Sequence, residues 1–422
     1  MMSDKLQFVA RSQFVGGIAK PGIDKLKFVG LFTGGLTVDE LLTKDNLYYR
    51  DLARSIAEKH VKPIAAELDR TGEYPWSIIN ALKEEGMMGV WIPKDYGGAG
   101  AGLLNLCIVV EEISRKCGGI GCTYVVNALG SLPIVLGGTE EQKKKYLPEI
   151  ASGKKLIAFC LSEKSAGSDA GSLKTHAERD GDDYVINGDK KWTTNGAAAS
   201  IYSVFATVNP ERGTRGITAF IVERETPGFE LGKREDLMGI RCVPVNETHF
   251  RDCRVSSAEL LGGAEGRGFK HAMMTLDVAR PFVAAQGLGI AQGALDLALE
   301  YTKERQQFGQ SIASFQGIQF MLADMATQVE AARHLVYTAA RAVDAGVKDV
   351  SKISAMSKVF ATDTAMKVST DAVQLFGGYG YCRDYPIEKY MRDAKITQIY
   401  EGTNQIQRMV IGRALIREGA TS

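Results

Sequence analysis

The sequence predicts an α+β protein made of three consecutive segments that are helical, β and helical in turn. Apolar residues recur at helical spacing from about residue 37, change to strand-like patterns near residue 156, and return to helical spacing from about residue 268. Grouped helices and strands, rather than alternating ones, favour separate layers. We expect an N-terminal arm over residues 1–37, an N-terminal helical domain over 38–155, a middle β-domain over 156–265 and a C-terminal helical domain over 266–422.

Apolar spacing and helix signals predict the N-terminal helical domain. Apolar residues recur every three or four positions from Leu47 to Ile64, and Pro75 marks the start of the next helix. We also expect helices over residues 103–114 and 140–146, the latter with a solvated face of acids and lysines. Residues 118–139 carry no charge and are long enough to span a bilayer, but six glycines and Pro133 favour a buried loop and helix.

The middle β-domain is predicted from short apolar runs that alternate with turn signals. Strands are expected over residues 156–161, 202–208 and 216–222, and the last strand ends near residue 254. Residues 184–192 are predicted to form a hairpin, because Asn187 and Gly188 are the residue types that supply positive φ in a two-residue turn.

Charge and cysteine usage exclude several classes of function. Lys+Arg number 51 and Asp+Glu 50, a net charge of +1, so neither nucleic-acid binding nor membrane insertion is expected. Seven scattered cysteines without a CxxC pair, and five histidines without HExxH, argue against a disulfide framework and against a metal site. We expect a reducing compartment, the bacterial cytoplasm or alternatively the mitochondrial matrix. The arm is a weak match to a transit peptide, because it contains acids.

The familiar nucleotide and nucleophile motifs are not present. Gly287, Gly289 and Gly293 approach the dinucleotide fingerprint, but the last glycine comes one residue late and no strand precedes them, so helix packing is the better interpretation. Neither GxxxxGK[ST] nor GxSxG occurs in the sequence.

Four motifs have two interpretations each. The small residues of 162–169 let a ligand approach the backbone or form a plain loop. Trp192 and Thr194 present an aromatic plane and a hydroxyl to a flat cofactor, or pack in the core. Arg305 binds a pyrophosphate beside Phe308, or is an exposed arginine at a helix end. The glycines of residues 374–380 approach a nucleotide, or cap a helix.

Glu401 stands between Tyr400 and Gly402, at a predicted break between helices. A carboxylate wedged there loses solvent, which raises its pKa and makes it a better base near neutrality. A surface glutamate is the alternative.

Taken in order, these motifs resemble the acyl-CoA dehydrogenase family. The resemblance covers about residues 38–418 and rests on FCLSEKSAGSD, KKWTTNG, DVARPFVAAQ, ERQQFG, QLFGGYGY and QIYEGTNQIQR, while DRTGEYP and EEQKKKYL resemble the medium- and short-chain branch. It implies a helical N-terminal domain, a barrel-like or sandwich-like middle β-domain and a C-terminal four-helix bundle. It also implies a homotetramer, a dimer of dimers, with FAD between the β-domain and the bundle.

The resemblance also assigns binding residues by motif position. Those expected at the flavin ring and in the adjoining loop are Phe159, Leu161, Ser162, Gly167, Ser168, Trp192 and Thr194. Those expected at the phosphate region of FAD are Thr403 and Gln405. Those expected to reach the adenosine half of a partner subunit's FAD are Arg305, Phe308, Gln316, Gln374, Gly377 and Gly378. Those expected to bind the acyl-CoA are Ser168, Asp277, Arg280 and Gly402, with Gly121, Cys122 and Val125 at the far end of the acyl pocket.

The resemblance implies that Glu401 is the catalytic base, since Ala279 carries no acid at the family's other position for it. The base removes the α-proton of an acyl-CoA while flavin N5 takes the β-hydride. The product is the trans-2-enoyl-CoA, and an electron-transfer flavoprotein receives the electrons. A linear butyryl to octanoyl group is our expectation. Branched, alicyclic, aryl-bearing and dicarboxylic groups are alternatives, the last because of Arg115 and Arg241. An acyl-CoA oxidase and a non-catalytic homologue are the competing functions.

Overall fold

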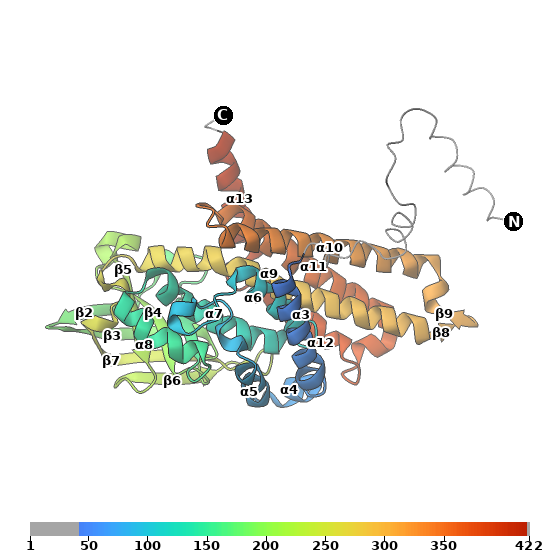
Figure 1. Cartoon of the computed structure of the whole chain (residues 1–422), viewed down its shortest axis with the longest axis horizontal. Helices are drawn as coiled ribbons and strands as arrows, with labels where there is room; N and C mark the ends of the chain where they lie inside the picture. The colour runs from blue at the N-terminus through green and yellow to red at the C-terminus, as the bar shows by residue number, and fades with distance from the viewer. Residues whose placement is uncertain (1–41, 420–422) are drawn as a thin grey trace. The chain divides into compact units, whose positions relative to one another are not determined.

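The computed structural model describes residues 42–419, so the arm predicted for residues 1–37 lies outside the described residues. Residues 48–419 belong to one compact unit, and Figure 1 shows the order of its helices and strands. The helices of the first segment are α3 (Lys44–Ile56), α4 (Ala65–Thr71), α5 (Trp76–Glu84), α6 (Gly102–Ser114), α7 (Gly118–Gly137) and α8 (Glu140–Ala151).

The charge-free stretch forms α7, one of the most deeply buried helices of the protein. Its residues are buried from Gly118 to Ile134. This confirms the prediction of a buried segment, although it is a single helix and not a loop followed by a helix. Helices α7 and α9 are long and apolar enough to cross a membrane, but most of each lies inside the folded protein.

The middle segment forms a seven-stranded sheet. Its strand order is β1-β4-β2-β3-β7-β6, and β5 pairs with β4. The alternating apolar residues meet in a core that includes Tyr184, Tyr202, Phe220 and Phe250. The strands are β1 (Ile157–Cys160), β2 (His176–Asp180), β3 (Asp183–Thr194), β4 (Ile201–Thr207), β5 (Ile217–Glu223), β6 (Phe229–Arg234) and β7 (Val245–Ser256).

The hairpin predicted at Asn187 and Gly188 is wrong, because both residues lie inside β3. The β2–β3 hairpin instead turns at Gly181, where φ is 66°. At Gly188 φ is 146°, the pairing with β7 shifts register, and an added Cβ would lie 2.6 Å from Thr175 Oγ1. The glycine thus serves a bulge, while the Asn187 amide donates to Asp252 Oδ1 across the strands at 3.1 Å.

The C-terminal segment is helical, as predicted. Its helices are α9 (Gly268–Glu304), α10 (Gln316–Asp344), α11 (Ser351–Phe376), α12 (Ile387–Thr397) and α13 (Asn404–Gly419), with the short strands β8 (Gln306–Gln307) and β9 (Gln310–Ser311) after α9. The long helices α9, α10 and α11 pack on one another, and α12 and α13 pack on α11. Helix α9 extends from beside β5 to the β8–β9 hairpin (Figure 1).

Two of the three glycines that approached a dinucleotide motif pack α9 against α6, while Gly287 faces Thr362 on α11. A Cβ at Gly289 would lie 2.3 Å from the Glu111 carbonyl oxygen, and one at Gly293 would lie 2.1 Å from that of Arg115. Backbone therefore occupies the space that any side chain would need, which confirms the helix-packing interpretation.

We expect Gly293→Ala to destabilise the protein by about 1–3 kcal/mol, because overpacking forces the two helices apart. The comparison is Gly412→Ala in α13, where an added Cβ meets nothing within 4 Å. That change should be neutral or slightly stabilising, since alanine favours a helix. Equal urea midpoints for the two variants would contradict the account of the α6–α9 contact.

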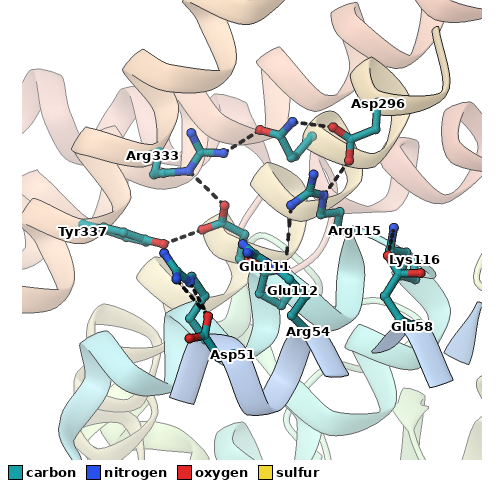
Figure 2. A network of polar contacts seen from close by, with 12 residues as sticks. Asp51, Arg54, Glu58, Glu111, Glu112, Arg115, Lys116, Asp296, Arg333 and Tyr337 are labelled. Carbon is teal, nitrogen blue, oxygen red and sulfur yellow. Dashed lines mark hydrogen bonds and ion pairs between the residues drawn. The ribbon is translucent and has the colours of Figure 1, made fainter. Parts of the chain in front are cut away.

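A network of polar side chains joins α3, α6, α9 and α10 beside these glycines (Figure 2). Buried Glu111 accepts from Arg333 Nε at 2.9 Å and from the Tyr337 hydroxyl at 2.7 Å. Arg333 also donates to Gln292 Oε1 at 2.6 Å, and burial of this cation is offset by the carboxylates around it. Further ion pairs of the network include Arg54–Glu112, Arg115–Asp296, Arg115–Glu112 and Lys116–Glu58.

Candidate active site

Glu401 lies in the turn between α12 and α13. Its φ is 54° and that of Gly402 is 84°, so two successive residues have left-handed backbone. Glu401 Oε2 is buried and has no hydrogen-bond partner among residues 42–419. Burial raises the pKa of Glu401 to about 7, although the charges of Lys358 and Arg280 act to lower it. The desolvation predicted from the sequence is therefore present.

Neighbouring side chains hold this turn in place. Gln407 Nε2 donates to the carbonyl oxygens of Glu401 at 3.1 Å and Gly402 at 2.9 Å. Lys358 Nζ donates to the Gly402 carbonyl oxygen at 2.8 Å. Thr403 Oγ1 accepts from the Ile406 N–H at 3.2 Å, which caps the start of α13, while Gln405 is exposed.

Helix α7 brings the predicted acyl pocket beside Glu401. The Tyr400 hydroxyl donates to Gln286 Oε1, and Gln286 Nε2 donates to the Gly118 carbonyl oxygen at 2.9 Å. Cys122, one helical turn further along α7, interacts with Tyr400, and burial raises the pKa of its thiol to about 12. Val125 is buried on the next turn.

Gly121 was expected at the far end of the acyl pocket, but its lack of a side chain has another reason. A Cβ there would lie 2.0 Å from Ser114 Oγ, so the space beside this glycine is filled by α6. Its lack of a side chain serves helix packing on that side of α7.

The residues expected at the flavin ring lie at the ends of two strands. Phe159 and Leu161 belong to β1 and the residue just after it, and the Lys191 N–H donates to the Ser162 carbonyl oxygen at 2.9 Å. Trp192 and Thr194 lie at the end of β3. Trp192 has a φ of 64° and a side chain that is 53% exposed, so an indole face is open to a planar ligand.

A buried ion pair anchors the loop that follows β1. Lys190 Nζ donates to Glu163 Oε1 at 2.7 Å and to the Leu161 carbonyl oxygen at 3.1 Å. Glu163 also accepts from the backbone N–H groups of Lys174 at 2.6 Å and Thr175 at 2.9 Å. These donors hold the pKa of Glu163 below its usual value against the effect of burial. The loop is therefore rigid at Glu163, whereas Gly167 and Ser168 beyond it are exposed.

Helix α7 also connects these strands to the Glu401 turn. Asn195, directly after β3, donates through Nδ2 to the Thr123 carbonyl oxygen at 2.9 Å. Ile157 in β1 donates through its N–H to Asn127 Oδ1 at 3.1 Å. Helix α7 thus contacts β1 and the end of β3, the strands that carry flavin-ring residues, while Cys122 interacts with Tyr400.

Two of the residues expected at CoA, Asp277 and Arg280, lie on α9, whereas Ser168 lies in the exposed loop after β1. The Arg280 guanidinium pairs with Asp277 Oδ1, and Ser351 Oγ donates to Asp277 Oδ2 at 2.6 Å. Arg280 is buried and its Nε has no partner among the described residues. The charge of Arg280 also acts on Glu401, whose pKa it lowers.

The residues expected to reach the adenosine half of a partner subunit's FAD lie around the far end of α9. Arg305 follows Arg280 by 25 residues, which corresponds to about 37 Å along a helix. It lies 5.4 Å over the Tyr379 ring, and Phe308 is 93% exposed. The remaining residues of this group are all exposed: Gln316, Gln374, Gly377 and Gly378. An added Cβ at either glycine would meet nothing within 4 Å. Within one chain, this group does not meet the residues around Glu401.

Sequence reasoning missed Lys358 and Gln286. Lys358 lies on a helix face outside the quoted motifs, whereas Gln286 ends the motif DVARPFVAAQ but was assigned no role. The available signal was spacing, because Lys358 falls in register with buried Ala355, Thr362 and Ala365 on α11. A lysine on a buried face requires partners and is therefore a candidate functional group.

Comparison with known proteins tests the resemblance directly. The family model for the acyl-CoA dehydrogenase N-terminal domain matches residues 43–154. The models for the middle and C-terminal domains match residues 158–253 and 266–416.

Relatives and solved structures match along most of the chain. The short-chain specific acyl-CoA dehydrogenase of Clostridium acetobutylicum is 46% identical over 383 residues, which cover 90% of this chain and 100% of that protein. Butyryl-CoA dehydrogenase of Megasphaera elsdenii has 46% identity and a TM-score of 0.87, covering 89% of this chain and 99% of its own. A chain from a structure of the electron transferring flavoprotein of Acidaminococcus fermentans has 51% identity and a TM-score of 0.87, with the same coverage. These matches confirm that the chain belongs to the acyl-CoA dehydrogenase family and is an oxidoreductase of that type.

Proposed function

We propose that this protein is an FAD-dependent dehydrogenase that converts an acyl-CoA to the trans-2-enoyl-CoA, with Glu401 as the base for the α-proton. The observation that carries the proposal is the buried Glu401 carboxylate, which has an unpartnered oxygen and a pKa raised to about 7. A base whose pKa lies near the working pH is ionised in a large fraction of molecules and still binds a proton strongly.

The residues present fit FAD. The open Trp192 face and the half-buried Phe159 suit a flat ring, and Thr194 offers a hydroxyl at its edge. Thr403 and Gln405 lie at the start of α13, where the positive end of the helix dipole favours phosphate. Arg305 and the exposed Phe308 are too far along α9 to join them, which supports their use on a partner subunit's FAD in a homotetramer. Bound FAD supplies the hydride acceptor.

The chain's own groups prepare the substrate for loss of the α-proton. A thioester α-C–H is a weak acid, so the developing enolate oxygen needs hydrogen-bond donors, for which the Glu401 backbone N–H is our candidate. The nearby positive charges of Arg280 and Lys358 favour the ionised base. The buried position of the carboxylate keeps water away from the proton in transfer.

The substrate proposal is an uncharged acyl chain, centred on butyryl to octanoyl. Buried Cys122 and Val125 present an apolar surface near Tyr400. Arg115 pairs with Asp296 at 2.5 Å and Arg241 with Asp236 at 3.0 Å, so each guanidinium already has a carboxylate. This disfavours a dicarboxylic acyl group. Similarity to a short-chain specific enzyme and to butyryl-CoA dehydrogenase also supports a short linear chain, with branched, alicyclic and aryl-bearing groups as alternatives.

An electron-transfer flavoprotein is the proposed electron acceptor. Similarity to a chain from the Acidaminococcus structure supports this choice. The bacterial origin of the relatives supports a location in a bacterial cytoplasm.

The decisive experiment is anaerobic bleaching of the flavin by linear, branched, cyclic and dicarboxylic acyl-CoAs. Fastest bleaching by butyryl- to octanoyl-CoA is expected. No bleaching by any acyl-CoA, with FAD bound, would leave a family fold without this chemistry. Stoichiometric peroxide during aerobic turnover would instead indicate an oxidase.

Removing the anchor of the β1 loop should weaken FAD binding. In Lys190→Met, Glu163 loses its buried cation and the loop at Leu161 and Ser162 loses a rigid support. We expect at least a roughly tenfold weaker affinity for FAD, or about 1.4 kcal/mol. Fluorescence titration of the apoprotein with FAD measures it. Lys164→Met, at an exposed position of the same loop, is the control and should bind FAD as the parent does.

A further inference from the structure

We propose that Lys358 is a positioning residue for the base: it holds the Glu401–Gly402 turn and keeps a positive charge beside the Glu401 carboxylate. The inference rests on the proposed function, in which Glu401 removes the α-proton.

The turn needs external support because of its backbone. Glu401 has a φ of 54° and is followed by Gly402 at 84°. A non-glycine residue with left-handed backbone persists only where the surrounding structure fixes it. Gln407 and Lys358 supply this support through the carbonyl oxygens of the turn. Gln407 does so as a neutral donor and Lys358 as a cation, so the two can be compared.

Lys358 is itself held in place. It is completely buried on α11, and Nζ donates to Asn404 Oδ1 at 2.8 Å as well as to Gly402. Asn404 in turn donates through Nδ2 to Thr362 Oγ1 at 2.9 Å and to Asp363 Oδ1 at 2.7 Å. The ammonium therefore ties the turn to α11 and to the first residue of α13.

The charge of Lys358 acts on the Glu401 carboxylate. Both hydrogen-bond acceptors of Nζ are neutral oxygens, and no ion pair of Lys358 occurs within residues 42–419. Burial lowers the pKa of Lys358 to about 7. The charges of Glu401 in the turn and Asp363 on α11 act to raise that pKa, and the charge of Arg280 on α9 acts to lower it.

Around Glu401 the titratable groups are these two cations and the Cys122 thiol and Tyr400 hydroxyl. Of the two cations, Lys358 lowers the pKa of Glu401 more than Arg280 does. This position gives Lys358 a role in catalysis that hydrogen bonding alone does not provide. Burial drives the carboxylate toward its protonated form, in which it cannot accept the α-proton. In its protonated form Lys358, held on the adjacent carbonyl, opposes that drift without forming an ion pair that would occupy the carboxylate oxygens.

The test compares Lys358→Met, Lys358→Gln and Gln407→Met in the FAD-loaded protein. Infrared difference spectra over a pH series follow the carboxylic acid C=O band of Glu401, identified by its loss in Glu401→Gln. This readout needs no turnover. Anaerobic flavin reduction over the same pH range gives the rate.

Both Lys358 variants should raise the Glu401 midpoint by about one pH unit, because an opposite charge nearby favours the ionised acid. The reduction rate should then fall about fivefold at pH 7 and recover as the pH is raised. Lys358→Arg, which keeps the charge, should restore the midpoint. Gln407→Met should lower the rate at every pH without moving the midpoint.

An unchanged midpoint in the folded Lys358 variants overturns the proposal, and so does an equal shift in Gln407→Met. If Lys358→Met does not fold, Lys358→Gln and Lys358→Arg provide the same comparison. Undiminished bleaching in Glu401→Gln would refute the proposed base, while the infrared midpoints would still report on Lys358.

Discussion

Glu401→Gln is expected to slow flavin bleaching by acyl-CoA on the order of 10⁴-fold, because the amide is nearly isosteric but cannot accept the α-proton. FAD binding should be retained, since the carboxylate Oε2 makes no hydrogen bond within residues 42–419. In the parent protein, kcat/KM should fall as the pH decreases through about 7, where Glu401 becomes protonated. Stopped-flow absorbance under anaerobic conditions measures both effects.

The same substitution should stabilise the protein above neutral pH. The folded pKa of Glu401 is raised from 4.5 to about 7, so the folded state binds more protons than the unfolded state between these values, and stability falls as the pH rises through them. At pH 8 the ionised carboxylate costs roughly 3 kcal/mol of stability. Removing the charge in Glu401→Gln should therefore raise Tm at pH 8 and change it little at pH 4.

Glu84→Gln, at an exposed position on α5, is the matched control and should alter neither rate nor Tm. Retention of more than a tenth of the parent rate in Glu401→Gln would exclude Glu401 as the base. A Tm at pH 8 that falls in this variant would contradict the costly burial of the carboxylate.

Arg333→Met is expected to lower the free energy of unfolding by about 3–5 kcal/mol, since it leaves a buried carboxylate without its cation. Figure 2 shows the reason: Arg333 on α10 reaches Glu111 on α6, which the Tyr337 hydroxyl also contacts. Within residues 42–419, only the Tyr337 hydroxyl would remain as a hydrogen-bond donor to that carboxylate. Denaturation in urea, followed by the change in helical signal, measures the loss.

A double-mutant cycle separates the buried charge from the lost packing. Glu111→Gln in the Arg333→Met background should recover part of the loss, because the unpaired charge is gone. Arg417→Met breaks an exposed pair with Asp349 and should change stability by less than about 1 kcal/mol. If Arg333→Met is no worse than Arg417→Met, the network does not stabilise the contact between α6 and α10.

The order of helical, β and helical segments was predictable because each follows from local periodicity. Burial of α7 was predictable for the same reason, since a stretch without charges has no preference for solvent. The hairpin at Asn187 and Gly188 was not, because a two-residue signal cannot distinguish a turn from a bulge in a long strand paired with β7.

The candidate base was predicted from its place in the family motif QIYEGTNQIQR. Tyr400, Glu401 and Gly402 are consecutive, and at a break between two helices a side chain can be covered from both sides. The reason for a small residue at Gly121 was not predictable, because Ser114, which fills the space, belongs to a different helix.

The sequence by itself therefore determined the segment order, the family and the identity of the candidate base. The tertiary structure alone decided which distant groups surround that base. Lys358, Arg280 and Gln286 come from helices far from residue 401 in the chain. The hydrogen bonds of Lys358 and Gln286 to the turn, and the effect of the Arg280 charge on Glu401, depend on how α9 and α11 pack. Electrostatic and hydrogen-bonding effects act through space, so no local pattern encodes the pKa of Glu401.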